Sequence, residues 1–82
     1  SEISVGKFDL FPNPTNGIIN IEFSNDLKRN VQIINQYGQN VLEIVTYKSN
    51  NSLNITNLSS GVYHVLVNDG LTVNSEKLII SK

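Results

Sequence analysis

The chain has 82 residues, a formal net charge of −1 and no cysteine. This length allows one small domain, the missing cysteines exclude disulfides and Cys-based metal sites, and the lack of a basic surplus argues against a nucleic-acid binder. No apolar run reaches the roughly 18 residues of a membrane helix, and no signal peptide is visible at the N-terminus. We therefore expect a module of a longer chain, with no nucleic-acid partner and no membrane insertion.

Short apolar segments separated by turn residues run along the whole sequence. Ile18–Phe23 alternates apolar and polar residues with a period of two, which is the pattern of a half-buried strand. Gly38 and the pair Asp69-Gly70 are typical of tight turns between strands. By these criteria we predict strands over Phe8–Phe11, Ile18–Phe23, Val31–Gln36, Val41–Tyr47, Ser52–Ile55, Gly61–Asn68 and Leu71–Ile80.

The alternation also predicts which side chains face the core. The register of Val41–Tyr47 stays open, because its apolar residues fall on both faces. Seven short strands without a helix indicate an all-β antiparallel sandwich over residues 8–82, preceded by a linker remnant at residues 1–7. The predicted inward residues are Ile19, Ile21, Phe23, Val31, Ile33, Leu53, Ile55, Tyr63, Val65 and Val67.

Both prolines of the chain lie in one block, Pro12-Asn13-Pro14-Thr15-Asn16-Gly17. Proline fixes φ and has no N–H, so the block cannot lie inside a sheet. We expect a rigid, exposed corner between the first two strands. It either only turns the chain or offers a preformed surface to a partner, which loses little entropy when it binds a rigid loop.

The segment Leu58-Ser59-Ser60-Gly61-Val62-Tyr63 precedes the sixth predicted strand. Its spacing resembles the tyrosine corner of Greek-key sandwiches, where the hydroxyl bonds to backbone a few residues upstream. We therefore predict that Tyr63 is buried. The last apolar strand is framed by Lys77 and Lys82, which suggests either a protected sheet edge or a terminal signal read by another protein.

Residues that carry chemistry are sparse. The only histidine, His64, alternates away from the face of Tyr63 and is expected to face solvent. No calcium loop, nucleophile elbow or phosphate-binding glycine loop is present. Three N-x-[ST] triplets begin at Asn50, Asn54 and Asn57, a number that chance explains in a chain so rich in Asn, Ser and Thr. We predict no enzyme, no metal and no cofactor.

Three motifs stand in a fixed order: F-P-N-P-T-N-G near the start, L-S-S-G-V-Y before the sixth strand, and K-L-I-I-S-K at the end. Together they resemble the C-terminal sorting domain of type IX secretion system cargo proteins (the Por secretion system domain, type A). The middle segment Ile34–Val41 is similar to that family's strand, glycine turn and strand. The resemblance covers about residues 8 to 82.

The resemblance implies an Ig-like β-sandwich that ends a cargo protein of a Gram-negative bacterium. It implies passage through the periplasm, recognition by an outer-membrane translocon, and removal of the domain at the cell surface by a sortase-like peptidase. The cargo, an N-terminal domain of the parent protein, is then released or joined to lipopolysaccharide. The residues that the family pattern assigns to recognition by translocon or peptidase are Pro12, Asn13, Pro14, Gly17, Gly61, Tyr63, Lys77 and Lys82.

Two other functions fit a small sandwich on a secreted enzyme. A carbohydrate- or ligand-binding module would need exposed aromatic residues on one face, and Tyr37 and Tyr47 are the candidates. A passive Ig-like spacer would need no particular surface. A spacer can lie anywhere in a chain, whereas a sorting signal must end it.

Overall fold

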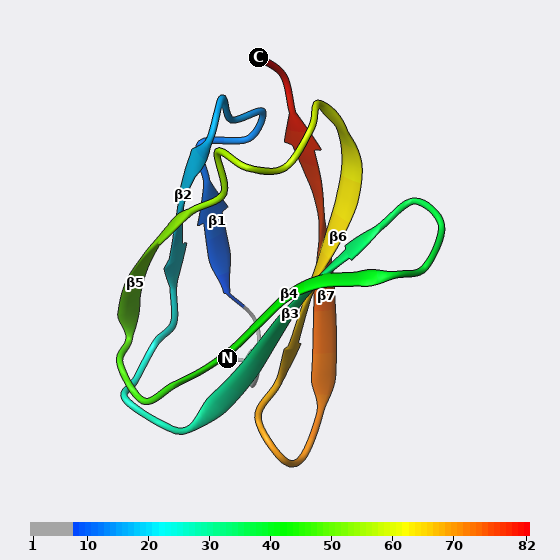
Figure 1. The fold of residues 1–82 in the computed structure, drawn as a ribbon. Helices are drawn as coiled ribbons and strands as arrows, with labels where there is room; N and C mark the ends of the chain where they lie inside the picture. Colours follow the sequence, from blue (N-terminus) through cyan, green and yellow to red (C-terminus); the bar gives the residue numbers. More distant parts are fainter. Residues whose placement is uncertain (1–7) are drawn as a thin grey trace.

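The computed structural model describes residues 8–82 and shows two packed layers of strands (Figure 1). These residues form one three-stranded sheet in the order β1-β2-β5 and one four-stranded sheet in the order β4-β3-β6-β7, all pairs antiparallel. The predicted all-β Ig-like sandwich is confirmed, while the predicted linker 1–7 lies outside the described residues. The strands are β1 (Asp9–Phe11), β2 (Ile18–Glu22), β3 (Arg29–Asn35), β4 (Asn40–Thr46), β5 (Asn50–Asn54), β6 (Gly61–Asn68) and β7 (Val73–Ile80).

The core lies between the two sheets and is built by the alternating residues of β2, β3 and β6. Nine of the ten predicted inward residues are buried, and Leu53 is half-buried against the same cluster. Side chains on one face of a strand share a layer, so this agreement follows from the period of two. The buried apolar residues are Phe8, Ile19, Ile21, Phe23, Val31, Ile33, Ile55, Tyr63, Val65, Val67, Leu78 and Ile80.

A bulge explains why the register of β4 was open. Ile33 pairs with Leu42 and Ile34 pairs with Asn40, so Val41 has no partner in the ladder. One extra residue reverses the alternation on one side of the bulge. Beyond it, Leu42 and Ile44 pack against the core, whereas Val45 is half exposed.

Three predicted strand starts were wrong by two residues, because the length of a strand depends on its partner strand and on the adjoining turn. β5 begins at Asn50 rather than Ser52, since β2 offers backbone partners as far as the pair Glu22 and Asn50. β7 begins at Val73 rather than Leu71, because Asp69 accepts backbone hydrogen bonds from Leu71 and Thr72 and closes a four-residue loop. The third is β3, which begins at Arg29 rather than Val31, and every other strand limit lies within one residue of its prediction.

An unpredicted feature is the burial of Arg29 at the start of β3. Its side chain is 3% exposed, and its guanidinium carbon lies 4.1 Å from the centre of the Phe23 ring. The two terminal nitrogens donate hydrogen bonds to backbone oxygens of Asn25 and Leu27 and to the side-chain oxygen of Asn25. A buried guanidinium needs such partners, and here it organises the loop between β2 and β3.

Candidate functional site

The six residues Pro12–Gly17, which we call the proline corner, connect β1 to β2. Pro12, Asn13 and Pro14 are exposed, as predicted, and each proline follows a cis peptide bond. Thr15 departs from the prediction: it is 2% exposed and forms an isolated parallel bridge with Ile80. The corner therefore touches the edge of the four-stranded sheet.

Four hydrogen bonds join the proline corner to β7 and to Ser81 directly after it, and we call them the corner–β7 contact. The side-chain amide of Asn13 donates to the Lys77 carbonyl at 2.7 Å and accepts from the Ile79 amide at 3.0 Å. The Thr15 amide donates to the Ile79 carbonyl at 2.9 Å, and the Thr15 carbonyl accepts from the Ser81 amide at 2.8 Å. An amide side chain has one donor group and one acceptor, so Asn13 pairs with the edge of β7 as a strand would.

Hydrogen bonds of the buried Thr15 hydroxyl hold the second half of the proline corner in place. The Thr15 hydroxyl donates to the Ile18 carbonyl at 2.7 Å and accepts from the Gly17 amide at 3.2 Å. Gly17 has a φ of +148°, and a Cβ there would lie 2.5 Å from the Thr56 methyl carbon. Only glycine combines this backbone angle with so close a neighbour.

Lys82 adds hydrogen bonds to the segment before β6, next to the proline corner. The Lys82 amide donates to the Ser60 hydroxyl at 3.1 Å, and the Lys82 ammonium donates to the Thr56 carbonyl. Gly61 pairs with Ile80 in the ladder between β6 and β7. Figure 1 shows the result: the C-terminus, the corner and the start of β6 all lie at one end of the sandwich.

The structure thus brings together all eight residues that the family pattern assigns to recognition, although they span the chain from position 12 to 82. They fall into two groups. The exposed group can touch a partner and consists of Pro12, Asn13, Pro14, Lys77 and Lys82. The supporting group shapes the region and consists of Gly17, Gly61 and Tyr63, which are buried or half-buried.

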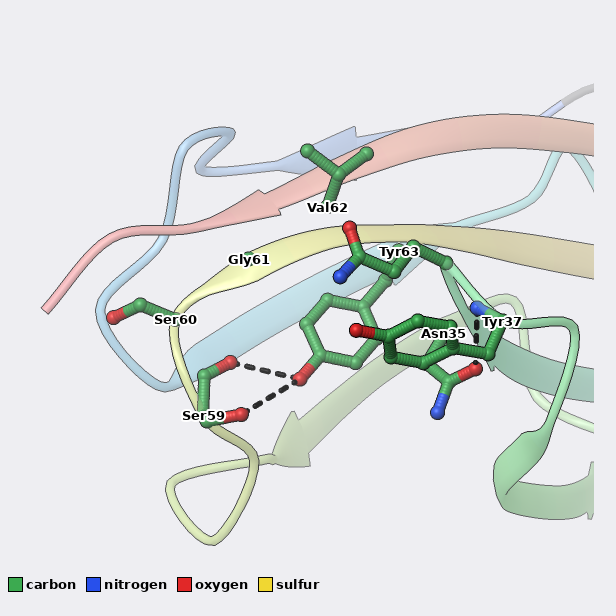
Figure 2. Close-up of a pocket in the computed structure, with 8 residues that line it drawn as sticks. Asn35, Tyr37, Ser59, Ser60, Gly61, Val62 and Tyr63 are labelled. Carbon is green, nitrogen blue, oxygen red and sulfur yellow. Dashed lines mark hydrogen bonds between the residues drawn. The ribbon is translucent and has the colours of Figure 1, made fainter.

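Tyr63 forms the predicted tyrosine corner. Its ring is 6% exposed, and its hydroxyl donates to the Ser59 carbonyl at 2.8 Å (Figure 2). Within the ladder Tyr63 pairs with Leu78 of β7. The residue therefore ties the loop before β6 to the core directly beneath the corner–β7 contact.

A shallow pocket lies beside this loop (Figure 2). Its volume is about 100 Å³, and the Tyr37 ring lies at its rim next to Tyr63. Ligand pockets of proteins usually measure about 300–1,000 Å³. The lining residues are Asn35, Gln36, Tyr37, Ser59, Ser60, Gly61, Val62 and Tyr63.

The two candidate aromatics of a sugar-binding face are separated. Tyr37 is 79% exposed and Tyr47 is 62% exposed. Tyr37 follows the end of β3, whereas Tyr47 follows Thr46, which pairs with Arg29 at the start of β3. They lie at opposite ends of the β3–β4 hairpin and form no common platform.

Side chains that could bind a metal ion are scattered over the described part of the chain. No group of three or more His, Cys, Asp or Glu residues that could hold a metal ion occurs in residues 8–82, and His64 is exposed, as predicted. Within the same range no helix has the length and apolar character to cross a membrane.

Two carboxyl groups have lowered pKa values. Hydrogen bonds from the side chains of Asn30 and Asn40 lower the pKa of Glu43, and backbone amides of Thr72 and Leu71 lower that of Asp69. Donors to an ionised carboxylate favour its charged form. Both groups stabilise loops or strands and lie apart from the proline corner.

Three residues of this region were missed as site residues from the sequence. Thr15 bridges to β7, while Thr56 and Ser60 accept the hydrogen bonds of Lys82. Thr15 lies within the quoted proline block, so its motif position was a usable signal. Thr56 and Ser60 act through a carbonyl and a hydroxyl that meet Lys82 only in the folded chain, and no pattern marks them.

Comparisons with known proteins identify the family and support the fold. The family described as "Secretion system C-terminal sorting domain" matches residues 9–81. No curated protein matches the chain by sequence. Among solved structures, the chain is similar to PorZ, a surface component of the type IX secretion system of Porphyromonas gingivalis, with a TM-score of 0.73 and 17% identity. That match covers 95% of this chain and 12% of PorZ, and at this identity it supports the fold alone.

The family match extends over nearly the whole described domain and includes the proline corner, the tyrosine corner and β7. The family consists of sorting signals rather than catalysts, and it marks secreted or cell-surface proteins of Gram-negative bacteria. The chain therefore belongs to the secretion system C-terminal sorting domain family and is a sorting signal of the type IX secretion system.

Proposed function

We propose that the export machinery recognises this signal at the end of the sandwich where the corner–β7 contact lies. The surface consists of Pro12, Asn13, Pro14, Lys77 and Lys82, and Gly17, Gly61 and Tyr63 hold it in shape. The observation that carries the proposal is the pairing of the Asn13 side chain with Lys77 and Ile79. It joins two motifs, more than 60 positions apart, into one surface.

The proposed partners follow from membership in the family. In this proposal the cargo crosses the inner membrane by a separate signal peptide and reaches the periplasm. An outer-membrane translocon then reads the surface, and a sortase-like peptidase removes the domain outside the cell, at a bond in or before residues 1–7. The domain itself carries out no catalysis. A rigid surface suits this role, since little conformational entropy is lost when a partner binds it.

The two rival functions are less well supported. A carbohydrate-binding module lacks a common aromatic face, because Tyr37 and Tyr47 lie at opposite ends of one hairpin. A passive spacer would not require the proline corner to be bonded to the last strand. Its prediction is that substitutions on the proposed surface leave export unchanged.

A secretion assay tests the proposal. Residues 1–82 are fused to the C-terminus of a fluorescent protein with a signal peptide, in a host with a working type IX system. The double variant Lys77→Gln, Lys82→Gln keeps the fold but removes the two surface charges. We expect the parent fusion in the medium or on the surface, and at least a tenfold larger periplasmic fraction for the double variant.

Matched controls separate recognition from folding. Lys48→Gln removes one exposed charge at the opposite end of the four-stranded sheet, and export should be unchanged. A version that stops at Glu76 lacks the buried residues Leu78 and Ile80, so it tests the need for the intact fold. Equal export of the parent and the double variant would overturn the proposed surface, and mass spectrometry of the exported cargo tests removal of the domain.

A further inference from the structure

The first half of β7, Val73–Lys77, lies at an open edge of the four-stranded sheet. β7 forms one edge of the four-stranded sheet and pairs in the ladder only with β6. The N–H and C=O of Ile79 both point away from β6, because they bond to Asn13 and Thr15. In an antiparallel ladder both groups of every second residue point to the same side. The N–H and C=O groups of Val73, Ser75 and Lys77 therefore also point away from β6.

The corner–β7 contact occupies part of this edge and stops at a defined point. Asn13 donates to the Lys77 carbonyl, and further toward the C-terminus the amide and carbonyl of Ile79 and the amide of Ser81 are also paired. In the described residues, the Lys77 amide and both backbone groups of Ser75 and Val73 stay open on this side. These five consecutive backbone groups can form hydrogen bonds to one short added strand.

Two of the three other edges carry a device against strand addition that this one lacks, and the third, β5, has only five residues. β1 has only three residues and is followed directly by Pro12, and the edge strand β4 contains the bulge at Val41. Short strands, prolines, bulges and charged edge side chains hinder strand addition, and of these devices β7 carries only the charges of Glu76 and Lys77. The eight residue pairs of β6 and β7 run without a register shift and contain no proline. Val73 is 59% exposed and Leu71 in the adjoining loop is 87% exposed, so apolar surface lies beside the open groups.

We propose that the open half of β7 binds an extended segment of another protein as an added antiparallel strand. The side chains along the edge define that segment. Val73, Ser75 and Lys77 lie on the solvent face, while Asn74 and Glu76 lie on the opposite face, because they pair with the core-facing Val67 and Val65. A matching segment has an acidic residue opposite Lys77, a basic residue opposite Glu76 and an apolar residue opposite Val73.

A second copy of this chain fits the same edge poorly. An antiparallel pair of two β7 strands centred on Ser75 would place Lys77 opposite Val73 and Glu76 opposite Asn74 of the other copy. Both charges would then lack an opposite charge across the pair. The charge pattern of β7 therefore favours a segment of a different protein over a second copy of this chain. The proposed binding edge shares Lys77 with the proposed recognition surface but uses neither the proline corner nor Lys82, so variants of Pro12, Asn13 or Lys82 can change export without changing binding at this edge.

The test uses the purified 82-residue chain and the capped peptide acetyl-Thr-Asp-Lys-Val-Thr-Val-amide. In antiparallel register its Asp lies opposite Lys77 and its first Val opposite Ser75. We expect titration of the ¹⁵N-labelled chain to shift the amide signals of Val73, Ser75 and Lys77 and to slow their hydrogen exchange. Exchanging the Asp and Lys of the peptide should weaken binding by about twofold to fivefold, as exposed charge pairs contribute modestly.

Backbone-directed controls make the test specific. Ser75→Pro removes one outward N–H and leaves the ladder to β6 intact, so it should abolish the shifts, whereas Ser75→Thr should retain them. If Ser75→Pro fails to fold, N-methylation of the peptide gives the same information. Methylating the Val opposite Ser75 should abolish binding, and methylating the Thr opposite Asn74 should not. Shifts elsewhere, equal binding of both methylated peptides, amides at Val73 and Ser75 that are protected without peptide, or a concentration-dependent dimer would each overturn the proposal.

Discussion

The side-chain oxygen of Asn13 accepts a hydrogen bond from the amide of Ile79 at 3.0 Å, across 66 positions of the sequence. The nitrogen of the same side chain donates to the Lys77 carbonyl at 2.7 Å. One side chain thus acts as a peptide group of a neighbouring strand and covers the edge of β7. The exposed corner and the last strand consequently form one structural unit.

Asn13→Ala should destabilise the domain by about 1–2 kcal/mol, because two hydrogen bonds of about 0.5–1.5 kcal/mol each are lost. Asn13→Asp should cost at least as much, since a carboxylate has no donor for the Lys77 carbonyl. Urea unfolding measures the stability, and hydrogen exchange of the Ile79 amide should become faster in both variants. Asn57→Ala, at an exposed loop position, serves as control. Normal exchange at Ile79 in the Asn13 variants would contradict the role of this side chain.

Tyr63→Phe should lower the free energy of unfolding by about 1 kcal/mol, since it removes only the hydroxyl that donates to the Ser59 carbonyl. The ring stays in the core, so the denaturant dependence should be unchanged. The matched change Tyr37→Phe affects an exposed ring and should leave stability unaltered. Equal unfolding midpoints for Tyr63→Phe and the parent would show that the hydrogen bond of the Tyr63 hydroxyl does not stabilise the domain.

Gly17→Ala should destabilise the domain by about 1–3 kcal/mol, because the new methyl group meets Thr56 and the positive φ is unfavourable for alanine. Gly38→Ala is the control for backbone angle alone, since φ is +83° there and no atom lies within 4 Å. Adding Thr56→Ser to Gly17→Ala removes the clashing methyl and should recover part of the loss. No recovery in the double variant would show that the contact with Thr56 is unimportant.

Lowering the pH should weaken the β6–β7 loop through Asp69. Backbone amides of Thr72 and Leu71 hold the pKa of Asp69 below its usual range. A carboxyl whose pKa is lower in the folded than in the unfolded chain stabilises the fold above about pH 4, and this contribution is lost as the pH falls through the folded-state pKa. Asp69→Asn keeps an acceptor oxygen but does not titrate. The melting temperature of the parent should exceed that of Asp69→Asn at pH 6 by more than at pH 2.5. An equal difference at both values would contradict this role.

The strands and the core could be predicted from sequence because alternation is local information. Ile19, Ile21, Val65 and Val67 were assigned to the core from the period of two alone, and they are buried. The bulge at Val41 could not be predicted, because it depends on which residue of β3 stands opposite. A single inserted residue leaves no mark in the sequence beyond a loss of alternation.

The corner–β7 contact was also beyond sequence reasoning. The motif order suggested that the proline block and the terminal strand have one function, but nothing in the residues said that they touch. The contact depends on hydrogen bonds of a side chain to backbone 64 and 66 positions away, and such bonds have no periodic signature. The burial of Arg29 was missed for a related reason, since arginine is usually exposed and its partners lie in the backbone of a loop.

Because β7 completes the core, a chain that lacks it cannot form the sandwich. Leu78 and Ile80 complete the core, and Asn13 and Thr15 find their partners only on Lys77, Ile79 and Ser81. These residues leave the ribosome after all the others described. A message cut short or a protein trimmed by a protease before Leu78 would lack both the finished sandwich and the surface next to it. Only a chain that includes β7 therefore carries the complete sandwich.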